Sequence, residues 1–183
     1  RRLCSLTKGR LLTYGVESPA DFMAEEIRLS LSGTEFYVVT PHGRCQVKSG
    51  LIGQHNVYNI LAACAVGLGE GVSWEHIQTG VESCVSVPGR MEAIRCGQPF
   101  HVFIDYAHTE DALQNVLRAI RAISRTRIIL VFGCGGDRDA GKRPKMGRVA
   151  SEFADHVIVT NDNPRSEPPQ QIIDQILSGF THD

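Results

Sequence analysis

Three short apolar runs in the second half of the chain each end in side chains that could bind a charged ligand. The three ends read Asp105-Tyr106-Ala107-His108, then Gly133-Cys134-Gly135-Gly136-Asp137-Arg138-Asp139, then Asp162-Asn163-Pro164-Arg165. An arginine guanidinium can hold a carboxylate or a phosphate through two parallel hydrogen bonds, and the amides of a glycine-rich turn can surround the same groups. The three ends therefore indicate a site for an anionic ligand.

Helical patterns at 110 to 122 and at about 143 to 154 separate these runs, which cover residues 101–108, 127–136 and 156–163. Short, continuous apolar runs between helices are typical of strands that are buried on both faces of a parallel sheet. The carboxyl ends of parallel strands lie at one edge of the sheet, where ligands bind in open α/β folds. We therefore predict an α/β fold in which the three ends form one site.

The first half of the chain carries a different pattern. Residues 10–50 alternate apolar and polar residues around a turn at Ser32-Gly33-Thr34, which predicts an antiparallel meander. A helix is predicted at 55–71, and a second one opens after Ser73. The apolar face of the first helix consists of Val57, Ile60, Leu61, Cys64, Ala65 and Leu68. We place the domain boundary at the Pro88-Gly89 turn.

Composition argues against several classes of protein. Among 183 residues, 19 Lys and Arg balance 20 Asp and Glu, so the chain has no overall field to hold nucleic acid or an anionic membrane. No apolar run reaches the roughly 18 residues of a membrane span, and the first residues lack a signal-peptide core, so we expect a cytoplasmic protein. Six cysteines without a C-x-x-C pair or a Cys/His cluster predict reduced, structural thiols and no metal site.

Each motif also has a purely structural interpretation. Asp105 could cap the helix at 110, although Thr109 is better placed for that role. His108 could be an ordinary loop histidine, and the glycine-rich stretch could be a tight turn between a strand and a helix. A dinucleotide site is disfavoured because Arg138 stands where the third glycine of that fingerprint would be.

Basic residues cluster after the glycine-rich stretch, at Arg138, Lys142, Arg143, Lys145 and Arg148. Such a cluster is ordinarily the solvated face of a helix. Here it follows a glycine-rich loop and is predicted to face the loop that carries Arg165, so anion recognition competes with the solvated face. Arg165 could instead pair with Glu167 or Asp162 and hold its own loop.

Five motifs together resemble the Mur ligases, which build the stem peptide of peptidoglycan. The motifs are GQHNVYNILAA, VPGRME, DYAHTEDAL, VFGCGGDRDAGKRPKMG and TNDNPR, and the similarity runs from about Leu11 to the end of the chain. Glu110 replaces the commoner proline of the third motif. More narrowly, the chain resembles the subgroup that adds meso-diaminopimelate. The resemblance implies the second half of a central ATPase domain over residues 1–88, then a partial Rossmann-like C-terminal domain with a parallel sheet over 89–183.

The resemblance also implies roles for single residues. Four are implied in binding ATP, with an amide near the adenine: Asn56, Asn59, Arg90 and Asp105. His108 lies toward the phosphate end of the nucleotide and is the candidate catalytic residue. Four are implied in binding meso-diaminopimelate: Arg138, Asp162, Asn163 and Arg165.

The implied reaction is an ATP-dependent ligation. ATP phosphorylates the D-Glu side chain of UDP-N-acetylmuramoyl-L-Ala-D-Glu, and the amine of meso-diaminopimelate then displaces phosphate. The family's phosphate loop, carbamylated lysine and G-K-G-H-E segment are absent from these 183 residues. We therefore expect a fragment that is inactive alone, with the Mg²⁺ ligands largely outside it. Two alternatives stay open: a non-catalytic plastid-type relative that serves as a complex subunit, and a folate-polyglutamate synthetase-like ligase, against which the DNPR loop argues.

Overall fold

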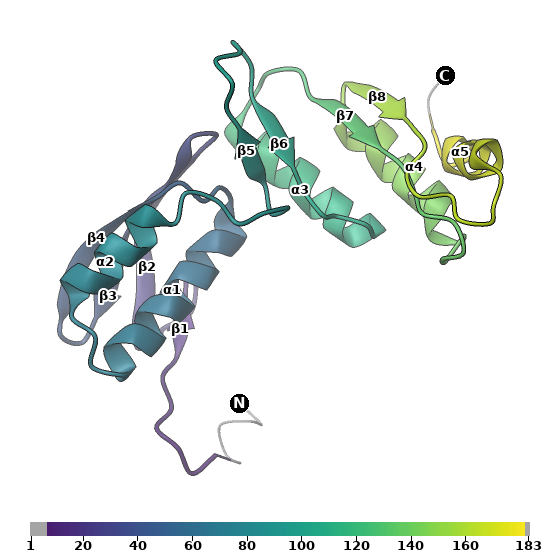
Figure 1. Ribbon diagram of the computed structural model, residues 1–183. Helices are drawn as coiled ribbons and strands as arrows, with labels where there is room; N and C mark the ends of the chain where they lie inside the picture. Colours follow the sequence, from purple (N-terminus) through teal and green to yellow (C-terminus); the bar gives the residue numbers. More distant parts are fainter. Residues whose placement is uncertain (1–6, 182–183) are drawn as a thin grey trace. The chain divides into compact units, whose positions relative to one another are not determined.

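The computed structural model describes residues 7–181 and divides into two compact units, 1–104 and 105–183 (Figure 1). The division falls between Ile104 and Asp105, and the predicted domain boundary at Pro88-Gly89 stays a prediction. Within the described residues, no helix is long and apolar enough to cross a membrane. Five of the cysteines are free, and the sixth, Cys4, lies outside the described residues.

The first unit is built on a four-stranded sheet in the order β1-β2-β3-β4. Its strands are β1 Tyr14–Gly15, β2 Phe22–Ser30, β3 Gly33–Thr40 and β4 Gly43–Ser49. The β2-β3 and β3-β4 pairs are antiparallel, which confirms the predicted meander, whereas the short β1 pairs with β2 in parallel. Phe36 and Val38 are fully buried while their neighbour Tyr37 is half-exposed, the period of two expected for a sheet with one covered face.

Helices α1 Gln54–Gly69 and α2 Trp74–Ser83 cover that face (Figure 1). The buried residues of α1 include Val57, Ile60, Leu61, Cys64 and Ala65, which confirms the predicted apolar face. Burial raises the pKa of the Cys64 thiol to about 11, so this cysteine is an inert core residue. Ser73 precedes α2 as predicted, but its hydroxyl lies 2.7 Å from Nδ1 of His76 and makes no cap bond to the helix backbone.

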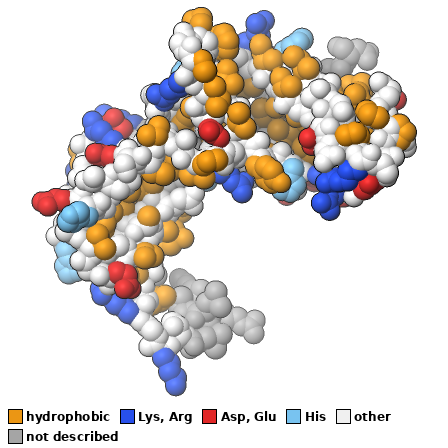
Figure 2. Space-filling view, viewed as in Figure 1, with side chains coloured by type: hydrophobic (Ala, Val, Ile, Leu, Met, Phe, Trp, Pro, Cys, Tyr) orange, Lys and Arg blue, Asp and Glu red, His pale blue; other side chains and the backbone are white. Residues whose placement is uncertain are grey.

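A short antiparallel hairpin, β5 Glu92–Ile94 and β6 Val102–Ile104, ends the first unit. We predicted the run at 101–108 as a strand of the parallel sheet, and in the structure that prediction is wrong. The turn between the two strands explains the difference. The Gln98 side chain accepts a hydrogen bond from the Cys96 amide and donates one to the Ile94 carbonyl, and this closed turn places β5 beside β6. Hydrophobic side chains gather over the hairpin (Figure 2), and 63% of Phe100 is exposed.

The second unit contains a parallel pair, β7 Ile129–Phe132 and β8 His156–Val159, with helices α3 Glu110–Ile123, α4 Lys142–Phe153 and α5 Pro169–Leu177. The helices at 110 and 143 and the parallel connection between β7 and β8 confirm the predicted α/β class. Thr109 caps α3 by accepting a hydrogen bond from the Ala112 amide, as predicted. Side chains from all three helices form the core: Leu113, Leu117, Met146, Val149, Ile172 and Ile176.

The β7-β8 pair is covered on one face only, which corrects the prediction of strands buried on both faces. Leu130, Phe132 and Val159 pack against the core that the three helices share. The alternate residues point the other way, and 52% of Ile129 and 59% of Val131 are exposed. The reason is that α3, α4 and α5 all contribute to the same core, so that no helix of the described unit covers the second face.

We expect Gly147→Ala to destabilise the protein by about 1–3 kcal/mol, the usual cost of overpacking. A Cβ at Gly147 would lie 2.0 Å from the carbonyl oxygen of Ile176, so α4 and α5 would have to separate. Gly80 is the matched control, because it is also helical and a Cβ there meets nothing within 4 Å. Gly80→Ala should keep or raise the thermal midpoint. Equal midpoints for the two variants would contradict this close approach.

Candidate ligand site at the carboxyl ends of β7 and β8

Two loops leave the sheet at the same edge and are interlocked through their backbones. One follows β7 (133–139) and the other follows β8 (160–167). The Gly136 amide donates to the Asn163 carbonyl at 2.8 Å. A Cβ at Gly136 would lie 1.8 Å from the Pro164 carbonyl oxygen, so only glycine fits this contact. The DNPR loop therefore packs directly against the backbone of the glycine-rich stretch.

Left-handed backbone conformations occur in both loops, at Asp137 with φ 54° and at Arg165 with φ 48°. This region is unfavourable for residues other than glycine and persists where the surroundings impose it. Here the loops impose it on each other, since Ser166 Oγ donates to the Asp137 carboxylate at 2.6 Å and the Asp137 amide donates to Glu167 at 2.6 Å. One strained residue, Arg165, is itself a proposed binding residue, and the other, Asp137, directly precedes Arg138.

Three of the predicted binding residues converge on Gly135. A Cβ there would lie 3.2 Å from Arg165 Nη1 and 3.9 Å from Arg138 Cγ, and it would lie 3.6 Å from the carbonyl oxygen of Asn163. All three residues are exposed, as is Asp162, so their side chains can meet a ligand. The structure thus brings Arg138, Asn163 and Arg165 together at Gly135, whereas Asp162 lies at the neighbouring Gly133, where a Cβ would be 3.1 Å from its Cβ.

The guanidinium of Arg165 donates through Nη1 to the Gly136 carbonyl. We had left open that Arg165 pairs with Glu167, and the structure contradicts that pairing. Arg165 bonds the backbone, and another arginine holds the Glu167 carboxylate. A guanidinium carries five N–H donors in a planar fork, so one bond to the backbone orients it and leaves further donors for a carboxylate.

The arginine that holds Glu167 is Arg143, at the start of α4. Its side chain has 0% exposure, which corrects the view of the basic cluster as a uniformly solvated face. Nη1 and Nη2 of Arg143 donate to the two carboxylate oxygens of Glu167 at 2.7 and 2.8 Å. The hydrogen bond from Arg143, followed by that from the Asp137 amide, lowers the pKa of Glu167 to about 2.

From the sequence we named Arg143 and Glu167 separately but missed that they pair with each other behind the site. A signal was present, because Arg143 shares a helical face with Met146, Gly147 and Ala150, and all four are buried. A charged residue on an otherwise apolar helical stripe predicts a buried ion pair.

The third predicted cluster, Asp105 to His108, forms a tight turn before α3. Oδ1 of Asp105 accepts a hydrogen bond from the Ala107 amide at 2.8 Å, and Nδ1 of His108 lies 3.0 Å from the Tyr106 carbonyl oxygen. Lys142 of α4 donates to the His108 carbonyl at 2.6 Å. This bond connects the His108 turn to α4. The residue after Lys142 on that helix, Arg143, bonds the other two loops.

Cys134 of the glycine-rich stretch is buried, and its thiol lies 3.8 Å from the sulfur of Met146. Burial raises the pKa of this thiol, so it stays protonated at neutral pH. The residue packs the loop onto the core, as the prediction of structural thiols requires.

The remaining predicted residues lie in the first unit. Asn56 is 5% exposed and donates to the Ile52 carbonyl at 2.9 Å, while its Oδ1 accepts from Asn59 at 3.1 Å. Asn56 therefore orients Asn59, which is exposed on α1. Arg90 is exposed in a turn closed by its amide to the Val87 carbonyl. Their roles toward a nucleotide stay predictions.

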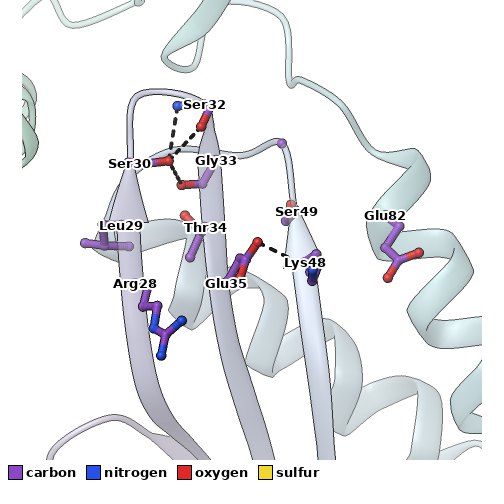
Figure 3. A pocket seen from close by; sticks show the side chains of 11 residues that line it. Arg28, Leu29, Ser30, Ser32, Gly33, Thr34, Glu35, Lys48, Ser49 and Glu82 are labelled. Carbon is purple, nitrogen blue, oxygen red and sulfur yellow. Dashed lines mark hydrogen bonds and ion pairs between the residues drawn. The ribbon is translucent and has the colours of Figure 1, made fainter.

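A cavity of about 600 Å³ lies elsewhere in the first unit, between the ends of β2, β3 and β4 and helix α2 (Figure 3). Its walls carry Arg28, the Glu35–Lys48 ion pair at 3.7 Å and Glu82. No predicted site residue lines it, so we assign it no part in the site. Nor do the described residues contain any group of three His, Cys, Asp or Glu that could hold a metal ion.

Two family models match the chain. Residues 89–182 match the Mur ligase glutamate ligase domain, and residues 2–67 match the Mur ligase middle domain. The first match alone covers more than half of the 183 residues. The chain therefore belongs to the Mur ligase family, which confirms the resemblance that its motifs indicated.

Relatives agree with this membership. The chain is 45% identical over 176 residues to the UDP-N-acetylmuramoyl-L-alanyl-D-glutamate--2,6-diaminopimelate ligase of Geobacillus kaustophilus, an alignment that covers 96% of this chain and 36% of that protein. The chain thus spans about a third of the length of the curated relatives that it matches.

Solved structures of the family have the same fold. A UDP-N-acetylmuramoyl-L-alanyl-D-glutamate--2,6-diaminopimelate ligase is 39% identical with a TM-score of 0.67, covering 92% of this chain and 35% of that one. A folylpolyglutamate synthase from Thermotoga maritima has a TM-score of 0.73 at 21% identity, covering 87% of this chain and 38% of that one. The second likeness concerns the fold alone.

Acid should destabilise the second unit through Glu167. Its folded pKa lies near 2 against an ordinary 4.5, so the stabilisation is complete above about pH 4.5 and is lost as the pH falls toward 2. We expect Glu167→Gln to lower the thermal midpoint at pH 6 and to flatten its decline between pH 5 and 2, measured by circular dichroism. Glu152→Gln, at an exposed position on α4, is the control. Parallel declines in wild type and Glu167→Gln would show that the Arg143 pair adds no pH-dependent stability.

Proposed function

We propose that this chain is part of a longer cytoplasmic ligase that adds meso-diaminopimelate to UDP-N-acetylmuramoyl-L-Ala-D-Glu with ATP. The observation that carries the proposal is the convergence of Arg138, Asn163 and Arg165 on Gly135 at the carboxyl edge of β7 and β8. The identity to relatives that bear this ligase's name supports the same assignment. Binding of ligand at this edge is the usual arrangement in open α/β sheets.

The chemistry of meso-diaminopimelate suits these side chains. One of its ends carries the attacking amine, and the far end carries a second carboxylate and a second ammonium group. We assign the far carboxylate to Arg165 and Arg138, because planar guanidinium groups bind carboxylates through two hydrogen bonds. Asn163 and Asp162 then serve the far ammonium group, since carboxylate and amide oxygens accept its protons.

We assign the His108 turn and the exposed residues of the first unit to ATP. Asn59, held by Asn56, would contact the adenine, and Arg90 and Asp105 would contact the ribose and phosphates. His108 would lie at the phosphate end as the catalytic residue. Mg²⁺ would accompany ATP, with its ligands largely outside this chain.

The proposed reaction transfers the γ-phosphoryl group of ATP to the D-Glu side-chain carboxylate, which leaves ADP. The amine of diaminopimelate then attacks the acyl carbon, and the C–O bond to phosphate breaks as the amide bond forms. Arginine and lysine side chains stabilise charge that develops on the phosphoryl group. Lys142 is placed to hold the His108 turn while this charge develops, through its hydrogen bond to the His108 carbonyl.

Arg165→Ala in the full-length ligase should raise the KM for meso-diaminopimelate at least about tenfold and leave the KM for ATP nearly unchanged. Loss of one partner of a desolvated charge pair costs about 2–5 kcal/mol, and about 1.4 kcal/mol corresponds to a factor of ten. Arg148→Ala is the matched control, since Arg148 is exposed on α4 and lies outside the two loops.

The comparison with lysine decides whether Arg165 sets specificity. Lysine lacks the far carboxylate, so wild type should reject it and Arg165→Ala should reject it much less. An unchanged preference ratio between the two amino acids would remove Arg165 from this role and leave it as a loop-holding residue.

Asp105→Ala should raise the KM for ATP and change the thermal midpoint only slightly. Asp105 lies at a half-exposed turn, and Thr109 already caps α3, so the fold depends little on this carboxylate. Asp111→Ala, at an exposed position in the first turn of α3, is the control for general effects of losing a carboxylate. A lower midpoint with unchanged ATP kinetics would show that Asp105 only shapes the turn.

A further inference from the structure

One buried side chain, that of Arg143, bonds both ligand loops and helix α5. Arg143 bonds both oxygens of Glu167, and it also bonds the Gly135 carbonyl at 3.2 Å and the Gln175 side chain of α5 at 2.5 Å. Gly135 belongs to the loop after β7, and Glu167 ends the loop after β8. The guanidinium therefore lies behind the site, on the core side of both loops.

Glu167 extends this link in the other direction. Its carboxylate accepts a hydrogen bond from the Asp137 amide at 2.6 Å, and its own amide donates to the Pro164 carbonyl at 3.0 Å. Asp137 is the residue before Arg138, and Pro164 is the residue before Arg165. The Arg143–Glu167 pair thus fixes the backbone immediately next to both proposed ligand-binding arginines.

A buried ion pair is a poor way to gain stability alone, because apolar side chains of similar volume commonly stabilise a core as well or better. Its advantage is geometry. A bidentate guanidinium–carboxylate pair has one favoured plane and one favoured distance, whereas apolar contacts permit sliding. Substrate-positioning groups need this accuracy, since a displacement of about 1 Å can cost about 100-fold in rate.

We infer that Arg143 and Glu167 are positioning residues, which set the separation of Arg138 and Arg165 so that the two side chains fit the far end of the amino-acid substrate. This inference rests on the proposed function. Neither residue of the pair touches the substrate, because Arg143 is completely buried and its partner's carboxylate is taken up by Arg143 and the Asp137 amide. The pair therefore acts on specificity from behind the site.

The test uses Arg143→Lys, the paired apolar variant Arg143→Met/Glu167→Met and wild type, each in the full-length ligase. Lysine keeps the charge and loses the bidentate geometry, and the paired variant removes the ion pair without leaving a buried charge. Thermal midpoint, the KM for ATP, and KM and kcat for meso-diaminopimelate and lysine are measured for each. Arg121→Met/Asp155→Met is the matched control, because it removes the Arg121–Asp155 pair, 2.8 Å long, elsewhere in the second unit.

We expect both Arg143 variants to raise the KM for meso-diaminopimelate at least about tenfold and to weaken its preference over lysine, with the KM for ATP unchanged. The paired variant should do so even where its midpoint equals that of wild type. The control pair should change the midpoint without changing the preference.

The inference would be overturned if the paired variant had the KM for meso-diaminopimelate, the preference over lysine and the thermal midpoint of wild type, because the ion pair would then be structural only. The Arg165→Ala variant separates a failure of the inference from a failure of the proposed substrate-binding role. If Arg165→Ala loses diaminopimelate selectivity and the Arg143 variants keep it, the inference fails and the proposed function stands. If Arg165→Ala keeps that selectivity, the assignment of Arg165 to the far carboxylate fails, and the inference that rests on this assignment fails with it.

Discussion

A buried guanidinium loses its hydrogen bonds to water and needs hydrogen-bond partners inside the protein. In the second unit this requirement connects α4, α5 and the loops after β7 and β8. Arg143 of α4 meets Glu167 after β8, the Gly135 carbonyl after β7 and Gln175 of α5. Breaking such a pair leaves a buried charge without a partner, so the loops and helices that supply the partners are held in register. The two loops can therefore be long and polar and still have one defined conformation.

The interlocked loops divide the work between backbone and side chains. Backbone groups hold the loops together, as in the bond from the Gly136 amide to the Asn163 carbonyl and the contact that excludes a Cβ at Gly136. Arg138, Asp162 and Asn163 stay exposed. Backbone strain at Asp137 and Arg165 belongs to the same arrangement, since it aims the flanking side chains and is stabilised by the opposite loop. The proposed site is therefore already shaped by the protein's own contacts, which would lower the entropy cost of binding the proposed substrate.

The first unit uses the same logic on a smaller scale. Buried Asn56 donates a hydrogen bond to the Ile52 carbonyl and accepts one from the side chain of Asn59, so it orients its exposed neighbour. Both asparagines lie on α1, where Asn56 is buried with Val57, Leu61 and Cys64 and Asn59 is exposed. The core thus fixes the helix rotation, and the helix rotation decides which of the two asparagines reaches solvent.

The sequence by itself determined the local elements and the family. Period two predicted the β2-β3-β4 meander, period 3.6 predicted α1, α3 and α4, and Thr109 marked the start of α3, because these depend on contacts within a few residues. The motifs placed Arg138, Asn163 and Arg165 at strand ends, and parallel pairing of β7 and β8 was enough to bring them together. Only the tertiary structure decided that β6 pairs with β5 and that one face of β7-β8 stays open. It also decided that Arg143 is buried against Glu167, while Arg138, Lys145 and Arg148 of the same basic cluster are exposed. Those outcomes depend on which surfaces the helices cover and on partners up to 32 residues away in sequence, as Gln175 is from Arg143. The helical stripe indicates that Arg143 is buried, but the pattern of residues along the chain does not specify which partners it meets.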